Sequence, residues 1–186
     1  MKKIISDRFL ESASVKQSVA SDETLLNLIS IVADRLRSAI KNGGTLYSCG
    51  NGGSCCDAMH LTEELVARYK KEREGFRAMC FSDPGGITCW ANDYDYNSLF
   101  ARYAKTFCTE KDVLFGFTTS GNSKNIIEAI KVAKEKGTFT VALTGKDGGL
   151  VKDIADISLI IPSDSTARIQ ESHITIVHIL CELLEA

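Results

Sequence analysis

The chain has 186 residues, of which 44% are hydrophobic and 25% are charged, and its formal net charge at pH 7 is −2. This length and composition are typical of one globular domain with a core of its own, so we expect a single domain over residues 1–186. The sequence has no basic run, which argues against nucleic acid or a membrane surface as a partner. No apolar stretch approaches the roughly 20 residues of a membrane-spanning helix.

The seven cysteines are scattered, and their spacing matches neither a disulfide framework nor a zinc ribbon. Several lie in apolar runs, where cysteine packs as a small hydrophobic residue. Residues 1–8 turn charged before any apolar segment of the signal-peptide type develops. These features predict a reduced, cytoplasmic protein.

Two helical patterns open the chain. The first runs from Ser6 to about Ala20, and the second follows N-cap residues Ser21 and Asp22 and ends at Asn42-Gly43-Gly44. No strand precedes either pattern, so this leading helical pair has no sheet partner in the sequence. We therefore expect residues 1–42 to wrap the core or to pack against another subunit.

Five β-type runs follow, and helical patterns separate them. The predicted strands are Thr45–Cys49, Phe76–Phe81, Val113–Phe117, Thr138–Leu143 and Ile157–Ile161. The main predicted helices are Ser54–Tyr69, Ser123–Lys136 and Ala167–Leu184. Strands that alternate with helices indicate βαβ units, so the predicted fold class is α/β with a parallel sheet.

Two loops carry the strongest functional signal, Cys49–Ser54 and Thr118–Ser123. Each follows an apolar strand and opens a helix, and each is rich in glycine, hydroxyl or amide residues. Such loops present free backbone N–H groups and the positive end of a helix dipole. Two of them at the same edge of a parallel sheet predict a site for a phosphorylated small molecule.

The helix after the first loop carries His60, Glu64 and Arg68 at positions i, i+4 and i+8. On a helix this spacing puts all three side chains on one face. A histidine and a carboxylate four residues apart can hold a divalent metal, and the carboxylate can also act as a base. On these three residues alone, a surface Glu64–Arg68 ion pair with a polar histidine neighbour is the favoured interpretation.

The last predicted helix is strongly apolar, yet it contains Gln170, His173 and His178. Buried polar groups need partners, and a lone buried histidine is usually a hydrogen-bonded core residue. His173 and His178 are therefore not both expected to be functional. Gln170 and His178 lie about two turns apart, so a shared ion requires their side chains to lean together or two subunits to contribute.

Three further segments allow two interpretations each. Asn92-Asp93 suits sugar hydroxyls or the cap of a following helix, and capping is favoured. The segment Thr144–Gly149 suits either a phosphate loop or a glycine-rich turn. Residues 163–166 favour a helix cap, with a phosphate contact as the alternative. The Asp83-Pro84-Gly85-Gly86 start of the segment after the second strand predicts a turn.

Taken together, these motifs resemble one known family, the phosphoheptose isomerases of the sugar-isomerase (SIS) domain superfamily. The resemblance rests on C-G-N-G-G-S at 49–54, D-A-x-H-x-x-E-E-L at 57–65, T-S-G-N-S at 119–123, L-T-G-K-D-G-G at 143–149 and A-R-I-Q-E-x-H at 167–173, followed by His178. It is detailed from about residue 40 onward. It implies a three-layer α-β-α sandwich, flavodoxin-like, with a five-stranded parallel sheet after two N-terminal helices.

The resemblance also implies an activity, the interconversion of sedoheptulose 7-phosphate and D-glycero-D-manno-heptose 7-phosphate through an enediol, as the first step of nucleotide-activated heptose synthesis. It implies Glu64 and His178 as catalytic residues, and one zinc ion per subunit held by His60, Glu64, Gln170 and His178. It implies a homotetramer with active sites between subunits. The implied substrate contacts are Asn51, Gly52, Gly53, Ser54, Glu64, Arg68, Asn92, Asp93, Thr118, Thr119, Ser120, Ser123 and Gln170.

Three alternatives stay open within this superfamily. One is a non-catalytic relative that binds a replication-initiation protein, and another is a sensor that binds a sugar phosphate without converting it. The third is isomerisation of a different phosphosugar.

Overall fold

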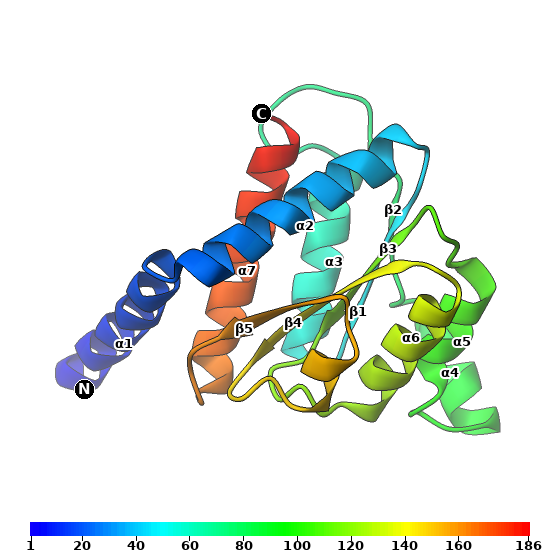
Figure 1. The fold of residues 1–186 in the computed structure, drawn as a ribbon. Helices are drawn as coiled ribbons and strands as arrows, with labels where there is room; N and C mark the ends of the chain where they lie inside the picture. Colours follow the sequence, from blue (N-terminus) through cyan, green and yellow to red (C-terminus); the bar gives the residue numbers. More distant parts are fainter.

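The computed structural model describes residues 1–186 and contains one parallel sheet of five strands in the order β2-β1-β3-β4-β5 (Figure 1). The strands are β1 (Leu46–Gly50), β2 (Ala78–Cys80), β3 (Val113–Phe117), β4 (Phe139–Gly145) and β5 (Ile157–Ile161). Helices cover both faces of the sheet, which confirms the expected three-layer α/β architecture. No helix combines the length and the hydropathy that a bilayer-spanning segment requires.

Each face of the sheet has its own hydrophobic core. One core joins the sheet to α2 (Glu23–Lys41), α3 (Gly53–Val66) and α7 (Thr166–Leu184). The other joins it to α5 (Leu99–Phe107) and α6 (Lys124–Glu135), with side chains of α4 (Pro84–Asp93) packed against it. The short helix η1 (Leu150–Asp153) connects β4 to β5. All five strands are thus held by apolar burial.

Side-chain alternation along β3 assigns its residues to the two cores. Phe115 and Phe117 lie in the core with α3 and α7, whereas Leu114 lies in the core with α6. Gly116 lies on the α6 side, where an added Cβ would come within 2.8 Å of a methyl group of Ile126. The missing side chain therefore lets α6 approach the sheet closely.

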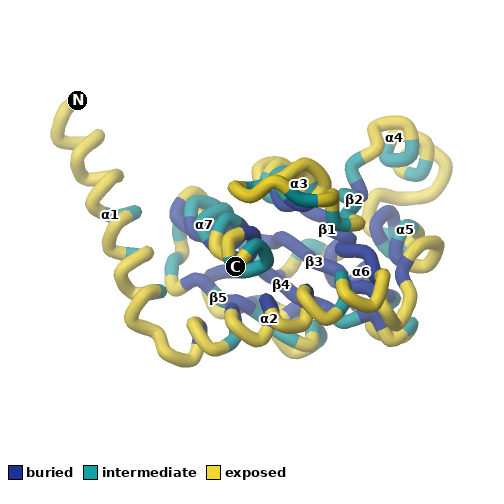
Figure 2. The backbone as a smooth tube through the Cα atoms, turned by 90° about the horizontal axis from the view of Figure 1, so that it is seen from above, coloured by how far each residue is buried: buried dark blue, intermediate teal, exposed yellow.

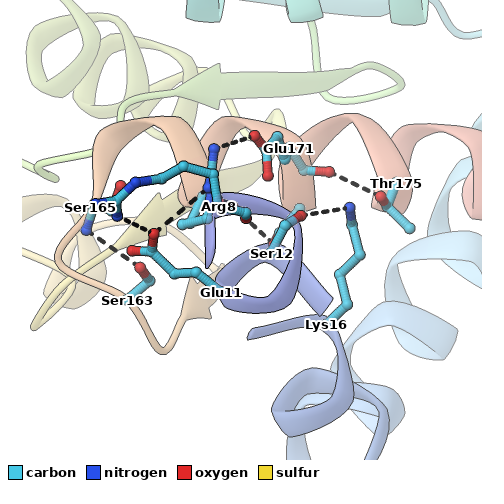
Figure 3. A network of polar contacts seen from close by, with 10 residues as sticks. Arg8, Glu11, Ser12, Lys16, Ser163, Ser165, Glu171 and Thr175 are labelled. Carbon is cyan, nitrogen blue, oxygen red and sulfur yellow. Dashed lines mark hydrogen bonds and ion pairs between the residues drawn. The ribbon is translucent and has the colours of Figure 1, made fainter. Parts of the chain in front are cut away.

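The two N-terminal helices differ in how far they are buried, since α2 packs against the sheet and α1 (Lys2–Ala20) has no buried residue. The helix α2 begins at the predicted cap, because the Asp22 carboxylate accepts a hydrogen bond from the Leu25 N–H at 3.0 Å. The helix α1 extends away from the body (Figure 2). Its contacts with α7 include a polar network that contains Arg8, Glu11 and Glu171 (Figure 3). In this network Arg168 of α7 donates to the Arg8 carbonyl at 2.9 Å and forms an ion pair with Glu171.

Two sequence predictions need correction. The helix α3 ends at Val66 rather than at Tyr69, because the following backbone N–H groups bond to the far end of α7. The Asp83-Pro84-Gly85-Gly86 segment is not a free turn but the start of α4, where Asp83 caps the helix by accepting from the Gly86 N–H at 2.6 Å. The sequence also predicts a helix after Asn92-Asp93 without giving its bounds, and this helix is α5, on which Leu99, Phe100 and Ala104 form a buried stripe.

Candidate active site

The two glycine- and hydroxyl-rich loops lie side by side. They follow β1 and β3, which are adjacent parallel strands whose ends, Gly50 and Phe117, are paired. Asn51 in the first loop and Asn125 in the first turn of α6 exchange two amide hydrogen bonds, of 2.9 and 2.8 Å. These bonds hold the N-terminal ends of α3 and α6 together. Helix N-termini favour anions, so the pair is suited to a phosphate group.

The glycine-rich segment Thr144–Gly149 packs against the loop Thr118–Ser123, which we call the hydroxyl loop. Gly121 and Gly149 both have positive φ angles, of 66° and 56°, and their backbones are in contact. A Cβ on Gly121 would lie 1.9 Å from the Gly148 carbonyl oxygen, and one on Gly149 would lie 2.4 Å from the Ser120 carbonyl oxygen. Asn122 also accepts a hydrogen bond from the Leu150 N–H at 3.1 Å. For Thr144–Gly149 this packing favours the interpretation as a turn over that as a phosphate loop.

The hydroxyl groups of the loop are partly ordered by internal bonds. Thr118 is buried and donates to the Ser123 hydroxyl at 3.1 Å. Ser120 accepts a hydrogen bond from the Asn122 N–H at 3.2 Å, and Thr119 and Ser120 are half-buried. In the first loop Gly52 and Gly53 are exposed, whereas Ser54 is buried. The loops therefore combine ordered hydroxyls with accessible backbone.

The structure brings His60, Glu64 and His178 together within one chain. One ligand atom from each residue lies within 4.8 Å of the other two. His60 Nε2 lies 3.2 Å from Glu64 Oε1 and 3.3 Å from His178 Nε2. His60 and Glu64 come from α3, and His178 comes from the neighbouring helix α7. The arrangement is more than a surface ion pair, since a third side chain from a distant part of the sequence completes it.

The donor set suits zinc in both chemistry and spacing. Zinc prefers imidazole nitrogen and carboxylate oxygen in tetrahedral sites, with bonds of about 2.0–2.1 Å, which separate neighbouring ligands by about 3.3 Å. The two distances at His60 Nε2 match this separation. His60, Glu64 and His178 thus form a group that can hold a metal ion.

Gln170 of α7 lies against the start of α3. An added Cβ on Gly53 would come within 2.7 Å of Gln170 Nε2, so α7 and the first loop meet at this point. The absence of a side chain at Gly53 makes this approach possible. The amide of Gln170 consequently lies beside the first residue of α3, about two turns before His60 and three turns before Glu64 along that helix.

Other predicted site residues are not part of this cluster. Arg68 lies beyond the end of α3, so it does not continue the helical face of His60 and Glu64 as the spacing predicts. Its side chain is 59% exposed and lies 3.8 Å from the Glu72 carboxylate. Asn92 and Asp93 lie in the last turn of α4 and are exposed, with Asn92 bonded to Asp93. They therefore do not cap the next helix, which begins after Ser98.

Comparisons with known proteins give a consistent result. The SIS domain family matches residues 9–145. The phosphoheptose isomerase of Vibrio cholerae is 45% identical to this chain, over 98% of this chain and 96% of the relative. That of Cytophaga hutchinsonii is 47% identical, over 94% of this chain and 92% of the relative. The chain belongs to the phosphoheptose isomerase family. A solved phosphoheptose isomerase from Francisella tularensis superposes with a TM-score of 0.93 at 35% identity, covering 98% of this chain and 96% of that one.

The two histidines of α7 in this phosphoheptose isomerase family member have different surroundings. His173 is fully buried, its Nε2 lies 3.2 Å from the Thr144 carbonyl oxygen, and burial lowers its pKa to about 4. It is therefore neutral at physiological pH and belongs to the core, against the ring of Phe117. His178 is half-buried and lies in the candidate metal group.

Four residues of the site were not found by sequence analysis. Asn125 is buried and orients Asn51, and the hydroxyl of Tyr96 donates to the same Asn51 at 2.7 Å.

Burial raises the pKa of Asp57 to about 6, although His60 acts in the opposite direction, and one carboxylate oxygen of Asp57 is buried without a partner. Tyr69 stacks on His178. Only Asn125 carried a signal, as a polar residue on the buried face of an amphipathic helix.

Burial of neutral His173 makes stability depend on pH. The unfolded chain binds a proton at this histidine as the pH falls below 6.5, whereas the folded chain does so only near pH 4. The free energy of unfolding of the wild type therefore falls as the pH is lowered over this range. Between pH 7 and pH 4.5 we expect the free energy of unfolding of His173→Gln to fall by about 2–3 kcal/mol less than that of the wild type.

Urea denaturation at the two pH values measures this difference at fixed protein concentration. Asp57 has a raised pKa and acts in the opposite sense, stabilising the fold as the pH falls, so only the difference between the two proteins is informative. An equal loss in wild type and variant would contradict the assignment of His173 as a neutral core residue.

Proposed function

We propose that this protein is a ketose–aldose isomerase that interconverts sedoheptulose 7-phosphate and D-glycero-D-manno-heptose 7-phosphate. This would be the first step of nucleotide-activated heptose synthesis. The proposal is supported by 45% identity to a phosphoheptose isomerase along nearly the whole chain. The observation that carries it is that the Glu64 carboxylate of α3 and the His178 imidazole of α7 lie in one cluster, on the helix pair that starts beside the two loops.

In this proposal the phosphate is bound by the hydroxyl loop and by the N-termini of α3 and α6. Binding the phosphate, which is remote from the reacting carbons, positions the sugar and lowers the entropic barrier. The proposed contacts are Asn51, Gly52, Gly53, Ser54, Thr118, Thr119, Ser120 and Ser123 for this end of the substrate. Arg68, Asn92 and Asp93 are exposed and are proposed to contact substrate in an assembled oligomer, together with Glu64 and Gln170.

The reaction moves a carbonyl between C1 and C2. From the ketose, a base removes a proton from C1, the C2 oxygen gains a proton to form the enediol, and a proton then returns to C2 as the C1 oxygen loses its own. Glu64 is the proposed base at carbon, with a side chain only 17% exposed. His178 is the proposed acid and base for the oxygen-bound protons. A positioned group of this type contributes about 10²–10⁴ in rate.

Zinc is the metal we propose for this site, one per subunit, held by His60, Glu64, Gln170 and His178. When bound, it would supply Lewis-acid polarisation of the substrate carbonyl. Three of these four residues already form the cluster in a single chain. We also propose that the enzyme acts in the cytoplasm, where its seven free cysteines would stay reduced.

Replacement of the proposed base tests the activity. Glu64→Gln keeps the size of the side chain but removes its basicity, so kcat for conversion of sedoheptulose 7-phosphate to the aldose is expected to fall about 10²–10⁴-fold. The matched control is Glu128→Gln, a carboxylate on α6 that is 47% exposed and pairs with Lys131, which should retain activity. Turnover of Glu64→Gln at the wild-type rate would reject Glu64 as the base.

Loss of the α7 ligand tests the metal. His178→Ala should bind zinc at least tenfold more weakly and lose activity, because a ligand and a proton shuttle are removed together. His173→Gln serves as the control on the same helix and should keep its zinc. Elemental analysis after dialysis reports the metal content directly, and stoichiometric zinc in His178→Ala would exclude this residue from the site.

We propose further that residues 1–42 assemble the protein into a homotetramer whose active sites lie between subunits. The support is the exposed apolar surface of α1, formed by four large residues that are 53–74% exposed: Ile4, Ile5, Phe9 and Leu10. A patch of this kind on a helix without buried residues is typical of a protein–protein contact.

Polar substitutions on α1 test this assembly. The double variant Phe9→Ser, Leu10→Ser should lower the mass measured by light scattering, because it removes apolar area that an interface would bury. Gln17→Ser, an exposed polar position on the same helix, is the control. A double variant with the wild-type mass would show that α1 does not hold the subunits together.

A further inference from the structure

The segment between α3 and β2 is tied to the end of α7 by one carboxylate. Glu185 accepts hydrogen bonds from the backbone N–H groups of Tyr69, Lys70 and Lys71, at 3.0, 2.8 and 2.8 Å. It also accepts from Arg73 Nε at 2.9 Å. In Figure 1 this segment passes beside the C-terminal end of α7. A single side chain therefore fixes three consecutive peptide groups.

Arg73 extends this contact to the helix that carries the proposed base. Its guanidinium donates to the carbonyl oxygens of Glu64 and Leu65, both at 2.9 Å. These carbonyls belong to the last turn of α3, where the C=O groups have no N–H partner within the helix. The Arg73 side chain is 13% exposed and that of Glu185 is 3% exposed, so the ion pair is largely shielded from water. It joins the C-terminal ends of α3 and α7.

The same attachment determines where Tyr69 lies. The Tyr69 ring stacks on the His178 imidazole, with ring centroids 5.7 Å apart and an angle of 26° between the planes. His178 also meets His60 from the other helix, with ring centroids 5.1 Å apart. The imidazole is thus held between an aromatic face and the candidate metal group. The position of Tyr69 depends on the peptide bonds that Glu185 holds.

We propose that Glu185 is a positioning residue for the active site, which acts by holding Tyr69 against His178 and, through Arg73, by fixing the end of α3 that carries Glu64. The catalytic part of this proposal rests on the proposed isomerase function, whereas its geometric part does not. Glu185 touches neither His178 nor Glu64 directly through its own side chain. Its effect passes through the 67–75 segment.

The charge state of Glu185 agrees with this role. Burial alone would raise its pKa, but the three backbone N–H groups and Arg73 outweigh burial and lower the pKa to about 2. The carboxylate is therefore ionised across the physiological range, and the attachment persists. Nearby Glu182 lacks these contacts, since it is 55% exposed and pairs only with the side chain of Lys70. This difference makes Glu182 the matched control.

A spectroscopic experiment tests the geometry without any substrate. The chain has three histidines, so selective histidine labelling of the full-length protein yields few and assignable NMR signals. The ring of Tyr69 should shift the His178 signals upfield. In Glu185→Gln this upfield shift should be lost, while the His173 signals in the core stay in place and report that the protein is folded. Glu182→Gln should leave all of these signals unchanged.

Kinetics and metal binding then test the consequence. For Glu185→Gln we expect kcat to fall about 10–100-fold with a small change in KM, and the dissociation constant for Zn²⁺ alone to rise by a similar factor. Tyr69→Leu should reproduce both effects. Tyr69→Phe, which keeps the ring, should retain the wild-type kcat and zinc affinity. If Glu185→Gln does not fold, the two Tyr69 variants still test whether the ring against His178 affects kcat and zinc binding.

The outcomes separate this proposal from the proposed function. An unchanged His178 signal in Glu185→Gln, or wild-type kcat and zinc affinity after that signal has moved, would overturn the positioning role. If the wild-type protein does not convert sedoheptulose 7-phosphate, the proposed function fails. In that case a lost His178 shift together with weakened Zn²⁺ binding in Glu185→Gln still supports the geometric part.

Discussion

The candidate site depends on the packing of α3 against α7. Apolar residues on the inner faces of the two helices, among them Leu61, Leu65 and Val177, lie in one core with the β3 face of the sheet. Burial of such side chains contributes about 1.5–3 kcal/mol each. This contact sets the distance between the helices, and thereby brings His60 and Glu64 to His178. Without it, the three polar residues would be separate surface groups.

Both ends of this helix pair are held in addition by polar or close-range contacts. At the start of α3, Gly53 leaves room for the Gln170 side chain. At the other end, Glu185 and Arg73 join the last turns of the two helices. The metal group lies between these two points. A site held at both ends can keep its geometry while charge develops during a reaction, which is the basis of electrostatic preorganisation.

The phosphate side of the site is constructed separately from the proton-transfer side. It depends on the adjacency of β1 and β3, on the amide pair of Asn51 and Asn125, and on the backbone contact between Gly121 and Gly149. None of these contacts involves the metal group. The fold therefore separates anchoring of a phosphate from chemistry at the other end of a sugar, with α3 as the element common to both.

The sequence by itself determined the α/β class, because hydrophobic periodicity and glycine or N-cap signals are local. The strands at 113–117 and 157–161 and the Asp22 cap follow from such signals. The i, i+4 spacing of His60 and Glu64 on one helix was equally local, as was the family motif. The resemblance also named His178, but periodicity alone did not separate it from His173.

Only the tertiary structure decided which polar residues meet. His173 and His178 differ because one faces the sheet and the other faces α3, and this depends on how α7 is rotated. The end of α3 at Val66 and the position of Tyr69 depend on Glu185, a residue more than 100 positions away in the chain. Arg68 follows the end of α3 at Val66, so it does not lie on the helical face that His60 and Glu64 share. Contacts over such sequence distances follow from packing of the whole chain, which no local pattern encodes.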